Sequence, residues 1–507
     1  MFKTFTEESK TLINFYKKKQ NFSFFIKKNL NDIKDIKDIK DIKDIKDIKD
    51  KSLYLKFQTN IYSILNKHIN NIYNLPINHN NKNTYNSNNE NYINKVNKIY
   101  NNHFITNPFI NSEIIQFIKD INKKNYKLLV YNLIYNDINI NIDIYIYEPL
   151  NSKLHLYYDN TVKNILLAIS LITELTNNKI NKCSSNGLNI SLFLTHFKRD
   201  VKIFNNNVIL GPNNANGGFC YGCTNEGNVV IYRRQDFFKT LIHELIHNFG
   251  VDDFILHFFL PDSSHPDKSI IYNKFINNFN FNKNIQQITS LNNIGINESI
   301  VEFLASFINL SIYSFSIIFQ NNNTLQNNNT LQNYLKKYHY YINQEIKHSL
   351  YQFNKILYIN KIDYTSIFDK SQNNYYTEKT NILSYYFFKL CLLYNYKEFI
   401  DENIIFKDTF LKFNDTKDNI IKFLYYLTCK SKNVNFVKDL NISKKLFLSN
   451  LRTYNQIMMN RNTGKTKKHN RNIGNIRKTG KTGKTKKHNS EIILLITNFK
   501  MVAIEYI

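Results

Sequence analysis

Residues 241–253 read LIHELIHNFGVDD, and positions 243–247 of this stretch form the pentapeptide HELIH. Two histidines four positions apart lie one above the other on a helix, so the rings of His243 and His247 can reach one metal ion. Glu244 lies beside them and can hold and deprotonate a metal-bound water, whose pKa Zn²⁺ lowers toward about 7. The stretch therefore predicts a zinc site with Glu244 as the general base.

The alternative is a core helix whose two histidines are satisfied by neighbouring side chains. The surroundings of the motif favour the metal site instead. Residues 228–233 predict a strand directly before it, and Asp236 opens a helix with strongly apolar positions. Gly250 is a natural stop for that helix, just before two acids. We therefore expect His243 and His247 on a helix that closely follows a strand.

A catalytic zinc site needs a third protein ligand, because three donors leave one position for water. Two residues compete for this place. Asp253 would complete HExxHxxGxxD, in which Gly250 lets the chain turn back under the metal. Glu298 lies on a downstream predicted helix, within GINESIVEF at 295–303. Because acids are common at turns after a helix end, Glu298 is the preferred ligand and Asp253 the alternative.

The predicted helix around Glu298 has a narrow polar stripe on an otherwise apolar surface. By their spacing of three and four, the residues of this stripe are Gly295, Glu298, Glu302, Ala305, Ser306 and Asn309. Burying the carboxylates of this stripe costs free energy unless a positive charge inside the protein pairs with them. A zinc–histidine centre would supply that charge. Glu302 could then accept the second ring N–H of a zinc-bound histidine and fix its tautomer. Alternatively, the stripe faces solvent and the apolar residues join a helical bundle.

These motifs resemble the zincin superfamily, and within it the gluzincin arrangement, in which a glutamate on a downstream helix completes HExxH and an acid follows four residues later. Three stretches are also similar to metallopeptidases encoded by nucleocytoplasmic large DNA viruses: IYRRQDFFKTLIHELIHNFGVDDF at 231–254, ESIVEF at 298–303 and TNILSYYFFK at 380–389. The resemblance covers roughly residues 130–430. It implies a zincin-like α+β fold, in which a mixed twisted sheet carries the active-site helix and a helical C-terminal subdomain follows.

The resemblance further implies that an edge strand of the sheet pairs with an extended peptide above the metal. Gly217 and Gly218 near such an edge would permit close backbone approach. Cys220 and Cys223 form a lone CxxC, for which a redox role and plain loop cysteines both stay open. Four further residues are weaker candidates for hydrogen bonding to the reacting carbonyl, with ordinary surface or core roles as the alternative: His257, His265, Tyr385 and Tyr386.

Hydrophobic periodicity predicts strands and helices in alternation. Isoleucines at every second position from 138 to 146 indicate a half-buried strand, and helical spacing follows a cap at Asp159 or Asn160. Residues 188–196 and 228–233 read as strands, and the pattern beyond about residue 290 is almost wholly helical.

We expect four regions: 1–125 with low-complexity linkers, 126–255 as the sheet subdomain with the HExxH helix, 256–460 as the helical subdomain with the third ligand, and 461–507 as a basic repetitive tail.

Low-complexity segments interrupt this pattern. Residues 32–50 repeat Asp-Ile-Lys and 69–102 are rich in asparagine, so both read as linkers, while the NNNTLQ duplication at 321–332 reads as an exposed loop. The segment 461–490 holds eleven Lys or Arg and no acid, in a chain whose net charge is +27. This segment predicts weak binding to nucleic acid or an anionic surface, with an expanded, solvated repeat as the alternative.

Cysteine usage and hydropathy limit the environment of the chain. Five cysteines, an odd number, argue against a disulfide-stapled secreted scaffold and favour a reducing compartment. The opening MFKTFTEESK lacks the features of a secretory signal. The uncharged apolar stretch 303–319 is short and polar for a bilayer span. We expect a soluble intracellular protein, cytoplasmic in a host cell or carried in a virion, with no membrane span.

The preferred function is a zinc-dependent metalloendopeptidase that hydrolyses bonds in a peptide or protein substrate. Zinc-bound water attacks the carbonyl, Glu244 transfers the proton, and His243, His247 and Glu298 hold the metal. One alternative is a non-enzymatic, metal-stabilised protein that binds nucleic acid or a virion surface through its basic tail. A second alternative is a zinc hydrolase that acts on something other than peptides.

Overall fold

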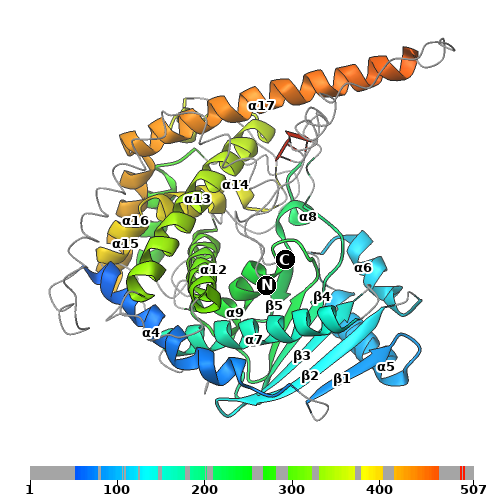
Figure 1. Ribbon diagram of the computed structural model, residues 1–507. Coiled ribbons are helices and arrows are strands. Elements are labelled where there is room, and N and C mark those ends of the chain that lie inside the picture. The colour runs from blue at the N-terminus through cyan, green and yellow to red at the C-terminus, as the bar shows by residue number, and fades with distance from the viewer. Residues whose placement is uncertain are drawn as a thin grey trace.

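The computed structural model (Figure 1) describes residues 52–467 apart from several gaps, together with 492–493 and 495–496. The gaps are 78–80, 106, 108–109, 124–125, 147–150, 177–182, 200, 202–208, 254–265, 281–294, 322–329, 372–377, 379, 403–410 and 412–415. The Asp-Ile-Lys repeat at 32–50 and the paired TGKTKKHN repeats beyond 467 lie outside the described residues.

An open, mixed, six-stranded sheet forms the lower right of the molecule in Figure 1, in the order β1-β2-β3-β4-β6-β5. The strands are β1 (Lys82–Asn86), β2 (Lys127–Tyr135), β3 (Ile138–Ile146), β4 (Leu188–Phe193), β5 (Gly218–Cys220) and β6 (Gly227–Ile231). The pairs β3–β4 and β4–β6 are parallel, and the other three are antiparallel. The predictions of an α+β fold, a mixed sheet and strands at 138–146, 188–196 and 228–233 are confirmed in substance.

Hairpin geometry and alternation explain the centre of the sheet. Asn136 and Asp137, between β2 and β3, have φ values of 49° and 62°, which suit a two-residue type I′ turn and set the register. On β3, Ile140, Ile142 and Ile144 enter the main core, whereas Tyr145 points to a second core on the other face. Both faces of the sheet are therefore covered.

Helices cover the two faces unequally. The main-core face carries α7 (Ser152–Leu175) and α9 (Phe237–Asn248), with α4 (Leu53–Tyr73) packed on α7. The other face carries α5 (Glu90–Ile99) and α6 (Ser112–Lys119), followed by the short helix η5 (Ile121–Lys123); the π-helix η4 (Tyr100–Phe104) joins α5 to the segment before α6. This arrangement leaves the HExxH helix α9 between the sheet and the remaining helices (Figure 1).

The remaining helices form a layer centred on α12, which packs against α9, α13 and α14. Their bounds are α11 (Pro266–Ile276), α12 (Ile296–Asn321), α13 (Thr330–Ile359), η7 (Tyr364–Ile367), α14 (Ile382–Tyr394), α15 (Tyr396–Asp401), α16 (Lys417–Ser431) and α17 (Val434–Lys467). By length and composition the stretch 296–319 of α12 could cross a membrane, and 94% of its apolar window is buried inside the fold. One continuous core joins the sheet region to this layer.

Two predictions about the N-terminal half are wrong. The asparagine-rich stretch 69–102 is not a linker, because it contains β1 and α5, and Tyr92 and Val96 of α5 are buried under the sheet. The helix predicted to follow a cap at Asp159 or Asn160 begins at Ser152, where the Asn151 side chain accepts a hydrogen bond from the Leu154 amide. Asp159 instead accepts from Lys82 and Tyr131, at 2.6 and 2.9 Å.

The predicted boundary of the basic tail is also wrong. Helix α17 continues across residue 461 to Lys467, and the NNNTLQ duplication falls at the connection from α12 to α13. Ile492, Leu495 and Ile496 are buried against α13 and α17, and Lys355 donates to the Leu495 carbonyl at 2.7 Å. Residues beyond the repeats therefore belong to the packed fold, because their apolar side chains find partners on two long helices.

The expectation of reduced cysteines is wrong for one pair. Cys183 and Cys223 form a disulfide across 40 residues, with their Cα atoms 4.8 Å apart. Cys220, the other half of the CxxC, is a free thiol. Sequence spacing could not indicate this pairing. The sheet brings the loop before β4, which holds Cys183, next to the loop after β5, which holds Cys223.

Candidate metal centre

The N-terminus of α9 is held by a buried arginine. Asp236, its N-cap, has φ 57° and ψ 24°, in the left-handed region that non-glycine residues rarely adopt. Arg199 donates to the Asp236 carboxylate and to the Ala215 carbonyl, each at 2.8 Å. A Cβ on Gly217 would lie 2.4 Å from Nη2 of Arg199, so this glycine makes room for the guanidinium. Arg199 thereby joins the start of α9 to the short helix α8 (Pro212–Ala215), which precedes the edge strand β5.

The C-terminus of α9 turns at a left-handed glycine. Gly250 has φ 59°, and the amides of Gly250 and Val251 bond to the carbonyls of His247 and Ile246 at 2.9 and 3.1 Å. This is a Schellman motif, which ends a helix and reverses the chain. The reversal brings the Asp252 carboxylate back to within 2.7 Å of Nδ1 of His247.

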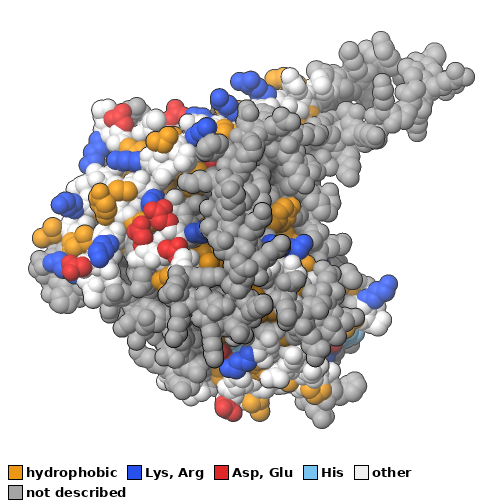
Figure 2. Space-filling model, turned by 60° about the vertical axis from the view of Figure 1, so that its left-hand side comes forward, with side chains coloured by type: hydrophobic (Ala, Val, Ile, Leu, Met, Phe, Trp, Pro, Cys, Tyr) orange, Lys and Arg blue, Asp and Glu red, His pale blue; other side chains and the backbone are white. Residues whose placement is uncertain are grey.

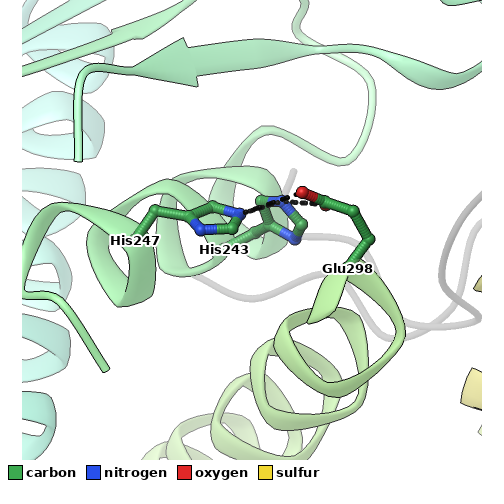
Figure 3. A group of neighbouring side chains, drawn as sticks. All are labelled: His243, His247 and Glu298. Atoms are coloured by element: carbon green, nitrogen blue, oxygen red, sulfur yellow. Dashed lines mark hydrogen bonds and ion pairs between the residues drawn. The ribbon is translucent and has the colours of Figure 1, made fainter. Parts of the chain in front are cut away.

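Three side chains converge above α9 (Figure 3). His243 and His247 project from α9, and Glu298 projects from the first turn of α12. Nε2 of His247 lies 3.1 Å from Nε2 of His243. The Glu298 oxygens lie 3.4 Å from Nε2 of His243 and 3.6 Å from Nε2 of His247. One donor atom from each residue falls within 4.8 Å of the other two.

These separations fit a tetrahedral zinc ion. Bonds of about 2.0–2.1 Å to nitrogen and oxygen place neighbouring tetrahedral ligands roughly 3.3 Å apart. The two ring nitrogens lie 3.1 Å apart, and each faces a different oxygen of Glu298: Oε2 lies 3.4 Å from His243 and Oε1 lies 3.6 Å from His247. These nearest separations scatter around the tetrahedral value. Two imidazole nitrogens and one carboxylate oxygen are also a donor set that catalytic zinc uses. The residues present therefore fit the ion that the sequence predicts.

Both rings are oriented by carboxylates on their far side. Nδ1 of His247 faces Asp252 at 2.7 Å, and Nδ1 of His243 lies 3.1 Å from Oε1 of Glu302. A proton on each Nδ1 leaves each Nε2 with a lone pair directed at the shared position. The contact between Glu302 and Nδ1 of His243 is an ion-pair contact without hydrogen-bond geometry, so the role of Glu302 as acceptor of this N–H stays a prediction. The partner of His247 was not foreseen.

The centre has an excess of negative charge. In the described part of the chain, the only cationic partners of Glu298 and Asp252 are the two imidazoles. Burial alone would lower the pKa of His247, but Glu298 and Asp252 outweigh it and raise that pKa well above its usual value. Burial likewise opposes ionisation of Glu298, yet His247 and His243 hold its pKa well below the usual range. A divalent cation would neutralise the same charge.

The predicted general base lies beside the edge of the sheet. Glu244 is buried, and burial raises its pKa, while the charges of His243 and His247 and a hydrogen bond from Cys220 offset this only in part. Cys220 belongs to β5, so the carboxylate of Glu244 lies next to the edge strand. The structure thus brings a buried carboxylate, three possible metal ligands and the last strand of the described sheet to one place.

Other sequence candidates fall elsewhere. The Asp253 carboxylate lies beside Gly250, where a Cβ would be 2.3 Å from its Oδ2, and Asp253 is not among the converging donors. Tyr385 is buried near Glu298 and Glu302, and burial raises its pKa well above the usual value. Tyr386 lies in the core against Lys389, whose Nζ is 5.2 Å from the ring centroid. His257 and His265 lie outside the described residues.

Three charged residues behind the centre, Lys239, Lys389 and Glu345, were not foreseen from the sequence. Lys239 donates to Glu302, and Lys389 of α14 lies 3.6 Å from the same Oε2. Glu345 of α13 lies 3.8 Å from Lys389. Two signals were available: Lys239 precedes His243 by one helical turn, and Lys389 is the single charge in the apolar run 382–394.

No family model, curated protein or solved structure matches this chain. The chemistry of the centre therefore rests on its own geometry. That geometry provides a cation position, a carboxylate able to move a proton, and an accessible side at Glu298, whose side chain is 42% exposed.

Proposed function

We propose that this chain is a zinc-dependent metalloendopeptidase with a zincin-like arrangement of sheet, HExxH helix and third-ligand helix. The observation that supports this function is the convergence of donors from His243, His247 and Glu298 within 4.8 Å. Three such ligands leave a coordination position for water, which distinguishes a catalytic site from a closed structural one.

The residues of the centre have complementary roles in peptide hydrolysis. When bound, Zn²⁺ acidifies a water molecule and polarises the substrate carbonyl. Glu244 accepts a proton from the water as its oxygen bonds to the carbonyl carbon, and then delivers that proton to the leaving amine nitrogen as the C–N bond breaks. Glu302 and Asp252 keep the Nδ1 protons of His243 and His247 in place.

The edge strand supports a peptide as the substrate. β5 pairs with β6 on one side only, so in the described part of the chain its other edge offers backbone N–H and C=O groups. An extended peptide can add to such an edge by main-chain hydrogen bonds. Because Cys220 of β5 contacts Glu244, a peptide on this edge would pass the general base.

Metal analysis beside cleavage of a peptide library tests this function. The wild-type chain should bind about one zinc per molecule, lose cleavage on chelation and regain it when Zn²⁺ is restored. Glu298→Ala should lose zinc and activity together, whereas the matched control Asp253→Ala should keep both. A wild-type chain that cleaves peptides equally well after complete zinc removal would contradict the proposal.

The alternative of polyanion binding is supported by one observation, the exposed face of α17. Lys438, Lys445 and Arg452 are exposed at intervals of seven residues, so they share one side of the helix. The single acid of α17, Asp439, accepts a hydrogen bond from Tyr394 at 2.8 Å. Figure 2 shows Lys and Arg side chains along the upper part of the described surface, where α17 runs.

Salt dependence separates this second function from the first. If α17 and the basic segment 461–490 bind nucleic acid, affinity for duplex DNA should fall steeply as salt rises, with a slope set by the phosphates neutralised. The triple change of Lys438, Lys445 and Arg452 to Gln should reduce that slope and leave peptide cleavage unchanged. Binding that is insensitive to salt would exclude this function.

A further inference from the structure

A buried row of alternating charges continues from the metal centre into the helical layer. It runs from His243 to Glu302, then to Lys389 and finally to Glu345, with contacts of 3.1, 3.6 and 3.8 Å. The side chain of Lys389 is 0% exposed and that of Glu345 is 1% exposed. The row joins four helices, α9, α12, α14 and α13, and ends well inside the core.

The two oxygens of Glu302 face different partners. Oε2 accepts from Lys239 and lies 3.6 Å from Nζ of Lys389, while Oε1 faces Nδ1 of His243 at 3.1 Å. Two ammonium groups on one oxygen fix the plane of the carboxylate, and that plane decides where Oε1 points. The direction of Oε1 in turn sets the orientation of the His243 ring.

The two lysines are not equivalent. Lys239 belongs to α9, as His243 does, so it moves with the ring that Glu302 orients. Lys389 belongs to α14 and is anchored by Glu345 of α13, so it fixes Glu302 from outside α9. Lys389 therefore connects α13 and α14 to the metal centre, which Lys239 cannot do.

Stability alone gives little reason to bury Lys389. Removing a buried charge together with its partner, and filling the volume with apolar side chains, is often neutral or stabilising. Lys389 interrupts an otherwise apolar helix, Ile382–Tyr394, whose other side chains are all buried as well. A role in orienting Glu302 accounts for its presence.

We infer that Lys389 is a positioning residue of the metal centre, which acts through Glu302 on His243 and so sets the affinity and coordination geometry of the bound ion. This inference rests on the zinc site proposed above. It assigns to Lys389 no contact with the metal or the substrate.

The test compares metal binding by folded variants. Zn²⁺ affinity is measured by competition with a chromophoric chelator, and the visible absorption of the Co²⁺-substituted protein reports coordination geometry. The variants are Lys389→Met, the conservative Lys389→Arg, and Glu345→Gln, which leaves both lysines in place. Lys355→Met is the matched control, because Lys355 is equally buried but bonds to Leu495, in a different cluster of the core.

Lys389→Met should weaken Zn²⁺ binding by about 10–100-fold and change the Co²⁺ spectrum, as removal of an outer-shell partner does. Lys389→Arg should restore most of the affinity, and Lys355→Met should leave affinity and spectrum unchanged. Wild-type affinity and spectrum in folded Lys389→Met would overturn the inference. If Lys389→Met does not fold, an unchanged Glu345→Gln would overturn it equally. A wild-type chain that binds no Zn²⁺ would instead refute the proposed function.

Discussion

Two groups of carboxylates, built around Glu298 and Glu302 one helical turn apart on α12, have opposite electrostatic environments. The outer group, Glu298 with Asp252 and Glu244, meets no lysine or arginine among the described residues. The inner group, Glu302 with Glu345, is balanced by Lys239 and Lys389. The comparison shows how one helix can carry both a site open to a cation and a closed structural network.

Solvent access separates the two glutamates of α12, although Asp252 and Glu244 of the outer group are themselves buried. The Glu298 side chain is 42% exposed, whereas that of Glu302 is 9% exposed. A buried carboxylate needs a permanent counter-charge, because desolvation otherwise disfavours its ionised form. A partly exposed carboxylate stays ionised without a fixed partner, because water solvates it, and it can then bind a cation from solution. Glu302 is therefore held by permanent counter-charges, whereas Glu298 is left available to a cation.

The largest expected effect comes from the general base. Glu244→Gln keeps the size of the side chain but cannot accept a proton, so peptide hydrolysis should fall by about 10²–10⁴-fold while zinc content stays at the wild-type level. Steady-state cleavage and metal analysis of the same preparation provide the check. Retained cleavage by this variant would remove Glu244 from the mechanism.

Neutralising the inner group should destabilise the metal-free protein strongly. Glu302→Gln leaves Lys239 and Lys389 without their shared partner, at a cost of about 3–5 kcal/mol in the free energy of unfolding. Glu298→Gln, one turn away, should change that free energy by less than about 1 kcal/mol, because Glu298 is partly exposed. Urea unfolding of both variants makes the comparison, and equal losses would show that the two groups do not differ.

A moderate effect is expected at the partner of His247. Asp252→Asn should weaken zinc binding by about 10–100-fold, because the amide no longer holds the Nδ1 proton as firmly. The neighbouring change Asp253→Asn should have no such effect. Chelator competition on both variants decides the point, and a greater loss at Asp253 would reverse the assignment of the two acids.

The smallest effect concerns a carboxylate with no part in either group. Glu174 of α7 binds Lys67 of α4 at 2.6 Å and also contacts His68. Burial alone would raise the pKa of Glu174, but these two partners hold it below the usual value. A lowered folded-state pKa contributes stability above the unfolded pKa, and this contribution is lost as pH falls through the folded value.

Glu174→Gln should therefore remove up to about 1 kcal/mol of stability at neutral pH and reduce the loss seen on acidification. Unfolding measured from pH 7 downward provides the test. Zinc affinity should not change, since the site lies on other elements; a variant whose stability falls with acid as steeply as the wild type would assign that acid sensitivity to other groups.

Much of the site could be anticipated from spacing within single helices. The pairs His243/His247 and Glu298/Glu302 each lie four residues apart, and the structure brings both to the interface of α9 and α12. Asp252 was harder to choose over Asp253, because the Gly250 turn decides which acid returns to the ring. The segment of α5 was predicted to be a linker because it is rich in asparagine, and only Tyr92 and Val96 of this helix are buried.

The order of residues alone determined which side chains share a helical face and which strands alternate, because these periodicities are properties of the local backbone. Only the tertiary structure decided that Lys389 and Glu345 stand behind Glu302, that Cys183 pairs with Cys223, and that Ile492, Leu495 and Ile496 join the core. Such contacts join segments 40 or more residues apart. Their partners are chosen by how whole helices and strands pack, which no local pattern records.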